Sequence, residues 1–243
     1  MTLSGFIDLH CHYVPDVDDG VRTFDDGVAL CRALRSIGYA KVVATPHMRP
    51  GMFDNDASHL RAAFDAFVER AQALPDMPEL GLASEHFFDP ETMQRLASDE
   101  GLPYPGRKSA LVELPPERLP LGLRELFFRL RVRGLRPVLA HPERYTPLFR
   151  DSDELATLID HGALAQLDLM SLVGKYGRKP KHTAERLLEE GLYFIASSDS
   201  HKPADVPLVA QAIERLRELV GDDEARQLLS DHPQQVLAGT VPD

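Results

Sequence analysis

The stretch FIDLHCHYVPDVDDG, residues 6–20, joins a strand-like apolar run to closely spaced histidines and aspartates. Because side chains alternate across a strand, His10 and His12 should point to the same face, where they would hold one metal ion. We expect Asp8, His10 and His12 to form a polar face of this strand. The opposite, apolar face would contain Ile7, Leu9 and Cys11 and would pack beneath helices. The stretch therefore predicts a first strand that ends in a metal site.

Two adjacent acids, Asp18 and Asp19, follow in the loop DVDDG. Adjacent loop carboxylates often serve as turn or cap residues, so at most one of the pair needs to bind metal. We include Asp19 among the candidate ligands and regard Asp18 as the weaker of the two.

Other strand-like runs along the chain also end in possible metal ligands. His47 follows VVATP, His141 closes RPVLAH, and SSDSH holds Asp199 and His201 two positions apart. A barrel of parallel strands gathers its strand ends at one face, so these side chains would meet there. The nine candidate ligands are His10, His12, Asp19, His47, Glu85, Glu113, His141, Asp199 and His201. Together they indicate a multinuclear metal hydrolase.

Each candidate, taken alone, has a simpler explanation. His47 could be a packed residue at the rim, and Glu85 or Glu113 could form a salt bridge or a helix cap. A serine-rich turn with an Asp N-cap would account for Asp199, although not for the histidine two positions later. His86 should point away from Glu85 if the strand persists, so it is not included.

The segment AHPERY, residues 140–145, places an arginine close to a candidate ligand. Arg144 follows the strand RPVLAH by three positions, and its planar guanidinium suits two parallel hydrogen bonds to a phosphate. A surface ion pair with a neighbour such as Glu143 explains the residue equally well. The segment is therefore compatible with phosphate binding without requiring it.

Apolar or β-rich runs alternate with amphipathic helical patterns along the chain. We expect strands near residues 5–11, 40–45, 79–85, 109–114, 136–141, 163–170 and 192–198. We expect helices near residues 25–37, 55–73, 90–98, 122–133, 152–161, 181–190, 205–219 and 222–230. Strand followed by helix, seven times over, predicts an α/β fold whose parallel sheet closes, or nearly closes, into a TIM-like barrel. At this length, residues 1–243 are expected to form a single domain.

Composition argues against several classes of protein. With 27 Lys+Arg against 38 Asp+Glu the net charge is -11, which repels nucleic acid and acidic membranes. No apolar stretch is long enough for membrane insertion and MTLSGFIDLH lacks signal-peptide features, so we expect a cytoplasmic location. Cys11 and Cys31 fit no C-x5-R phosphatase loop, because Val17 and Ile37 lie six positions later. A cysteinyl-phosphate mechanism is therefore not expected.

Seven segments, in order between residue 7 and about residue 203, resemble the polymerase and histidinol phosphatase (PHP) superfamily: IDLHCHYVPDVDDG, ATPH, SEH, VEL, LAHPERY, QLDLMSLVGKYGRK and SSDSH. More narrowly, they resemble its manganese-dependent protein-tyrosine phosphatases of bacterial capsule and exopolysaccharide systems. The resemblance implies a distorted (β/α)7 barrel with a trinuclear metal centre. It also implies hydrolysis of phosphotyrosine by metal-activated hydroxide.

The resemblance further implies roles for individual residues. The nine strand-end residues named above would bind three divalent ions, with manganese favoured, although imidazole and carboxylate ligands also suit iron or zinc. Arg144 matches an arginine that binds the substrate phosphate, and Asp199 and His201 are expected to act beside it in catalysis. Some of these phosphatases carry a second arginine shortly after the final histidine, where this chain has only Lys202.

Four functions compete. The first is a phosphatase for phosphotyrosine in a protein, which the resemblance suggests is a tyrosine kinase of polysaccharide export. The second takes a small ester such as histidinol phosphate. The third, a metal-dependent amidohydrolase, would be favoured by a carboxylated lysine at a strand end, but no predicted strand ends in lysine. The fourth, a catalytically silent partner of the kinase, would be expected to lack ligands, and none is missing. Nothing in the sequence indicates an oligomeric state.

Overall fold

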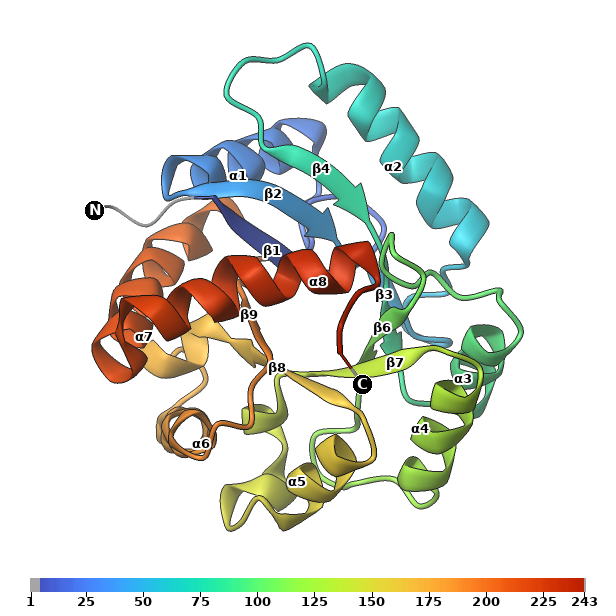
Figure 1. Cartoon of the computed structure of the whole chain (residues 1–243). Coiled ribbons are helices and arrows are strands. Elements are labelled where there is room, and N and C mark those ends of the chain that lie inside the picture. Colours follow the sequence, from blue (N-terminus) through green and yellow to red (C-terminus); the bar gives the residue numbers. More distant parts are fainter. Residues whose placement is uncertain (1–4, 243) are drawn as a thin grey trace.

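The computed structural model describes residues 5–242 and shows a ring of strands surrounded by helices (Figure 1). The strands are β1 (Phe6–Cys11), β2 (Tyr39–Ala44), β3 (His47–Met48), β4 (Glu79–Leu82), β5 (Glu85–Phe87), β6 (Ser109–Glu113), β7 (Arg136–Ala140), β8 (Leu164–Asp168) and β9 (Ile195–Ser197). They form two sheets, in the orders β1-β2-β4 and β3-β5-β6-β7-β8-β9. All of these strands pair in parallel, so the expected α/β architecture is confirmed.

The predicted strand 79–85 is interrupted near its carboxyl end, and the predicted strand 40–45 is followed by a short strand that the sequence does not predict, β3. Thr45 and Pro46 separate β2 from β3, because proline has no N–H to donate to the ladder. Between β4 and β5 the hydroxyl of Ser84 donates to the Pro46 carbonyl over 2.6 Å. Beyond both breaks, β3 pairs with β5 in a register that sets His47 beside Glu85. The interruptions therefore bring two candidate ligands together.

The first and last strands close the ring. The N–H of Asp199 donates to the carbonyl of His10 over 2.9 Å, and the N–H of His12 donates to the carbonyl of Ser200 over 2.9 Å. Cys11 and Ser200 form a parallel bridge at the same seam. If β2 is counted with β3 and β4 with β5, the ring contains seven strands. This is the expected distorted (β/α)7 barrel.

Apolar side chains fill the barrel interior. One buried cluster takes residues from strands around the ring: Ile7, Leu9, Val43, Leu111, Val138, Ala140, Leu164 and Ile195. Val236 and Leu237 of α8 (His232–Ala238) belong to the same cluster, and α8 crosses the opening of the barrel in Figure 1. A larger cluster lies between the strands and the surrounding helices. One end of the barrel is thus sealed by apolar side chains of α8.

The surrounding helices are α1 (Phe24–Ser36), α2 (Ala57–Ala71), α3 (Pro90–Ala97), α4 (Leu123–Val132), α5 (Asp153–Asp160), α6 (Arg178–Glu189) and α7 (Val206–Arg226). The predicted break near residue 220 is a kink at Gly221, whose φ of 81° is readily adopted only by glycine. Sequence analysis does not predict α8, which follows a π-helical turn at Gln227–Asp231. Within residues 5–242, no helix is both long and apolar enough to cross a membrane.

The predicted division of the first strand into two faces is wrong. Ile7 and Leu9 lie in the interior cluster, whereas Cys11 packs in the outer cluster with residues of α1. The pairing of β1 with β2 shifts register between Asp8 and Cys11, and the Asp8 carboxylate accepts from the N–H of His10 over 3.2 Å. Such an irregularity interrupts the alternation of side chains. Asp8 therefore supports the backbone beside the candidate site.

Candidate metal centre

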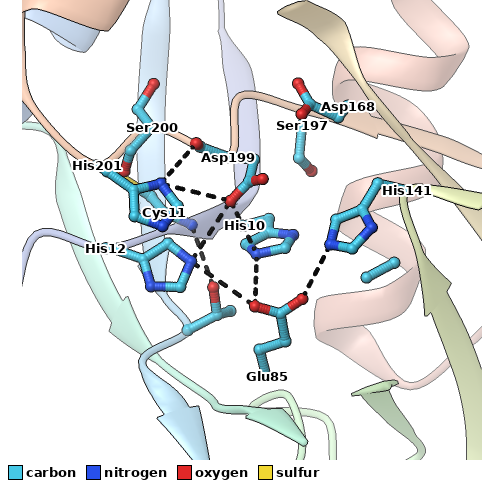
Figure 2. A network of polar contacts seen from close by, with 12 residues as sticks. His10, Cys11, His12, Glu85, His141, Asp168, Ser197, Asp199, Ser200 and His201 are labelled. Carbon is cyan, nitrogen blue, oxygen red and sulfur yellow. Dashed lines mark hydrogen bonds and ion pairs between the residues drawn. The ribbon is translucent and has the colours of Figure 1, made fainter. Parts of the chain in front are cut away.

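Glu85, at the start of β5, lies at the centre of the predicted ligands. Its carboxylate is 3.2 Å from Nε2 of His10 and 3.2 Å from Nε2 of His141 (Figure 2). It is also 3.1 Å from Nδ1 of His47. These histidines come from β1, from the end of β7 and from β3, so separate parts of the ring converge on one buried carboxylate.

Asp199, just after β9, connects a second set of donors. Its Oδ1 lies 3.1 Å from Nε2 of His10 and 3.4 Å from Nε2 of His12. Its Oδ2 accepts a hydrogen bond from Nη1 of Arg144 over 2.7 Å. The rings of His12 and His201 stack with their centroids 4.0 Å apart. The candidate ligands and the predicted phosphate-binding arginine therefore belong to one network.

Asp19 forms the open edge of this network. Its carboxylate lies 3.5 Å from Nε2 of His47 and 3.4 Å from Nε2 of His201, and its side chain is 53% exposed. Donor atoms of four residues lie within 4.8 Å of one another: His12, Asp19, His47 and His201. A solute could reach the network from this edge.

Two further donor groups lie deeper and overlap the first. Their members, again with donor atoms within 4.8 Å of one another, are His10, His12 and Glu85 in one group and His47, Glu85 and Glu113 in the other. His141 and Asp199 join through their contacts with Glu85 and His10. The structure thus brings all nine predicted ligands together.

Several buried donor atoms of the cluster have no hydrogen bond of good geometry with any residue between 5 and 242. They are Nε2 of His12, Nδ1 of His47, Oε2 of Glu113 and Nδ1 of His141. Leaving a buried polar atom without a partner costs about 1–3 kcal/mol. Metal coordination would satisfy such atoms, and imidazole nitrogens with carboxylate oxygens suit manganese, iron or zinc. The residues present therefore fit divalent ions.

Without metal, the cluster is a network of buried ion pairs. Burial would lower the pKa of His10, but the carboxylates of Asp199 and Glu85 raise it to about 10. Burial likewise opposes the shifts at His47 and His201, whose pKa values neighbouring carboxylates nevertheless raise to about 9. At pH 7 these three imidazoles are thus protonated, and they must release their protons to bind metal.

Two residues outside the predicted set hold the candidate ligands in place. Oδ2 of Asp18 lies 2.7 Å from Nδ1 of His12 and accepts from the N–H of His47 over 3.1 Å. Oε1 of Gln166 lies 3.0 Å from Nδ1 of His10. An acceptor at Nδ1 leaves Nε2 available as a metal ligand, which is common in metal sites. Asp18 is therefore a supporting residue, while Asp19 faces the candidate ligands.

Arg144 lies at the rim and is held from three sides. Its Nη1 lies 2.7 Å from Asp199 and 3.6 Å from Asp168, and its guanidinium is 4.4 Å from the ring centroid of Tyr176. The alternative ion pair with Glu143 is wrong, because that carboxylate is fully buried and accepts hydrogen bonds from other groups. Asp168 is not among the predicted site residues, although it ends β8 and so follows the strand-end pattern of the other candidates.

The backbone at two candidate ligands has an uncommon conformation. His141 has φ 35° and Asp199 has φ 47°, both in the left-handed region that favours glycine. Such residues store about 1–3 kcal/mol of strain each and are frequent at functional sites. The turns after β7 and β9 therefore direct these side chains into the cluster at some expense in stability.

The residues that sequence analysis excludes lie outside the cluster. Cys11 and Cys31 are buried, and burial raises the pKa of both thiols well above the ordinary value, which disfavours a thiolate nucleophile. Nδ1 of His86 lies 2.9 Å from the carbonyl of Leu111, away from the donor groups. Lys202 is exposed and forms no ion pair within the part of the chain that the structure describes.

This chain resembles known proteins in both sequence and fold. The profile of the CpsB/CapC family of capsular polysaccharide synthesis matches residues 6–238. The tyrosine-protein phosphatase YwqE of Bacillus subtilis is 33% identical over 80% of this chain and 77% of its own. The tyrosine-protein phosphatase CpsB of Streptococcus pneumoniae is 27% identical over 95% of this chain and 98% of its own. A crystal structure from work on YwqE and CpsB, described as unique metal-dependent tyrosine phosphatases, has a TM-score of 0.90 and 28% identity, covering 98% of this chain and 96% of that one.

Proposed function

Because the chain belongs to the CpsB/CapC family of capsular polysaccharide synthesis, we propose that it is a metal-dependent protein-tyrosine phosphatase. The observation that carries the proposal is the convergence of nine candidate ligands, Glu85 and eight others, several with buried atoms that lack a hydrogen-bond partner among residues 5–242. The names of YwqE and CpsB, both tyrosine-protein phosphatases, support the same activity.

We assign three divalent ions, with manganese preferred over iron or zinc, to the three overlapping donor groups. Bound ions would supply Lewis acidity and lower the pKa of water so that hydroxide forms near neutral pH. Four carboxylates would offset part of the positive charge of three such ions: those of Asp19, Glu85, Glu113 and Asp199. A net positive site of this kind suits the dianion of a phosphate monoester.

Arg144 would bind the substrate phosphate through two parallel hydrogen bonds from its guanidinium. Tyr176 and Asp168 restrict the orientation of this side chain at the rim. We assign to Asp199 and His201 the positioning of the reacting groups, because Asp199 contacts Arg144 and His201 lies at the partly exposed edge. In this arrangement the phosphate would lie between Arg144 and the donor groups.

We propose phosphotyrosine in a protein as the substrate, and a tyrosine kinase of polysaccharide export as the protein. Association of the family with capsular polysaccharide synthesis supports this choice. A phenolate leaves more readily than an alkoxide, so phosphotyrosine should react faster than phosphoserine. A kinase substrate of this kind would place the enzyme in the cytoplasm.

The decisive experiment compares metal-free and manganese-loaded protein on phosphotyrosine peptides, phosphoserine peptides and histidinol phosphate. We expect no turnover without metal, recovery with manganese, and the highest kcat/KM on phosphotyrosine. Full activity of protein shown to be metal-free would refute the metal-dependent mechanism. A far higher rate on histidinol phosphate would instead indicate a small-molecule phosphatase. Metal analysis that finds one tightly bound ion would contradict the assignment of three.

Replacement of Arg144 separates phosphate binding from metal binding. Arg144→Ala removes charge-assisted hydrogen bonds and should lower kcat/KM about 30- to 1000-fold, with metal content unchanged. Arg144→Lys should restore activity only in part, because an ammonium cannot reproduce the planar pair of donors. Equal kcat/KM for the wild type and Arg144→Ala would exclude this role.

A further inference from the structure

A basic pocket outside the metal centre has no role in the proposed chemistry. It encloses about 560 Å³ and is lined by Thr146, Phe149, Arg150, Lys179, His182, Thr183 and Arg186. Three of these residues are Lys or Arg, a fourth is histidine, and none is acidic. The net charge of the whole chain is -11, so the pocket is a local basic region on an acidic protein. It would attract an anionic group.

The pocket is continuous with the segments that hold Arg144. One wall is the 3-10 turn Thr146–Phe149, which begins two residues after Arg144. The other wall is α6, which begins two residues after Tyr176, the residue whose ring lies 4.4 Å from the Arg144 guanidinium. Arg186 of α6 donates to the carbonyl of Leu148 over 2.5 Å and so ties the two walls together.

Two of the positive charges in the pocket are not neutralised. Arg150 and Lys179 are exposed, and neither forms an ion pair with any residue in the described range 5–242. Lys179 Nζ lies 5.8 Å from the ring centroid of Phe149, so the pocket also has an aromatic wall. Arg186 forms a long ion pair with Glu190 at 3.9 Å, and Nδ1 of His182 lies 4.0 Å from Glu185. The positive charges of Arg150 and Lys179 are therefore available to interact with a ligand.

We propose that this pocket binds a second anionic side chain of the same phosphotyrosine protein, either a carboxylate or a second phosphate. The inference rests on the proposed function, since Arg144 marks where the phosphotyrosine would bind. Arg144 and Arg150 are six positions apart, so their Cα atoms are separated by at most about 22 Å. An extended peptide spans that distance with about six residues. The anionic residue thus lies within about six positions of the phosphotyrosine.

The test measures kcat/KM on three phosphotyrosine peptides that differ only in their flanks. One has neutral flanks, one carries aspartate and glutamate on both sides, and one carries a second phosphotyrosine. The measured quantity is the ratio of each anionic peptide to the neutral peptide, so that general changes in activity cancel. The variant is the double charge reversal Arg150→Glu with Lys179→Glu. The matched control is Arg61→Glu on α2, across the barrel from α6 (Figure 1).

For the wild type we expect at least one anionic peptide to exceed the neutral one by about 10-fold at low salt. The double variant should bring that ratio to one or below, whereas Arg61→Glu should leave it unchanged. A preference for the acidic peptide identifies carboxylates as the ligand, and a preference confined to the doubly phosphorylated peptide identifies phosphate. Wild-type ratios near one, or an unchanged ratio in the double variant, would overturn the pocket proposal. Absence of activity on every phosphotyrosine peptide would instead refute the proposed function.

Discussion

The two ends of the barrel are built from opposite kinds of residue. At the amino-terminal ends of β6 and β7, the segment after α8 lies against the barrel, and Val236 and Leu237 of α8 pack into its apolar interior. At the carboxyl ends of the strands, buried histidines and carboxylates meet around Glu85, and several of their atoms lack hydrogen-bond partners. The first end gains stability from burial, whereas the second gives up stability to form a binding site.

Most of the side chains at both ends are buried, so burial alone does not distinguish the two ends. The difference is that apolar atoms need no partner, whereas a buried imidazole or carboxylate needs a hydrogen bond, a counter-charge or a metal ion. The backbone follows the same division, since His141 and Asp199 at the polar end have left-handed conformations. Substitutions at the two ends should therefore change different properties.

The largest expected effect is at the polar end. Glu85→Gln keeps the shape of the side chain but removes the charge at the centre of the cluster. If metal ions supply several kcal/mol of transition-state stabilisation, their loss should lower kcat at least about 1000-fold. Metal content should fall in parallel. The control is Glu79→Gln, because Glu79 begins β4 and its side chain is 69% exposed. A fully metallated, active Glu85→Gln protein would contradict this account.

At the apolar end, Leu237→Ala should destabilise the fold without altering the chemistry. Removing a buried leucine side chain costs about 2–4 kcal/mol, which is a change of about 30- to 1000-fold in the folding equilibrium. Denaturant unfolding measures this loss. The kcat of the folded, metal-loaded variant should equal that of the wild type. A large fall in kcat at unchanged stability would show that the two ends are coupled.

A smaller effect is expected for the residue that supports His12. Asp18→Asn retains an acceptor but loses the negative charge 2.7 Å from Nδ1. Replacing such outer partners usually lowers metal affinity about 10- to 100-fold. Competition with a chelator measures the change, and saturating metal should restore most activity. An unchanged affinity would make Asp18 a purely structural residue.

The last prediction changes the pH and no residue. The pKa values of His10, His47 and His201 in the metal-free protein are raised to about 10, 9 and 9, so protons occupy these ligands at pH 7. Metal binding should release protons, and affinity should fall as pH falls, about 10-fold per unit for each proton displaced. Titration of manganese into weakly buffered protein measures the release directly. Uptake of protons, or no exchange, would show that the imidazoles are neutral before metal binds.

Much of the architecture could be predicted because strand ends carry a local signal. An apolar run that stops at His47, Glu113 or His141 indicates both a strand and a functional side chain. The alternation of such runs with helical patterns predicts the parallel barrel. Asp168 carries the same signal at the end of β8, and it contacts Arg144 although it is not among the predicted residues.

Other features depend on contacts that are distant in the sequence. The facing of β1 could not be predicted, because the register shift between Asp8 and Cys11 is set by pairing with β2. The support of His10 by Gln166 joins residues 156 positions apart. The apolar role of α8 arises only when the barrel offers Val236 and Leu237 an interior to fill. Patterns of neighbouring residues in the sequence do not predict such long-range contacts.

The seam between β1 and β9 has a consequence for how the protein is made. His10 and His12 leave the ribosome almost 190 residues before Asp199 and His201. At about 5–20 residues per second, the early ligands precede the late ones by roughly 10–40 s. During that interval the nascent chain has only part of the donor set, so the complete set of nine ligands forms only after the last strand. Pairing over such a long separation is also intrinsically slow. Because it includes this seam, the complete metal site is one of the last parts of the fold able to bind its ions.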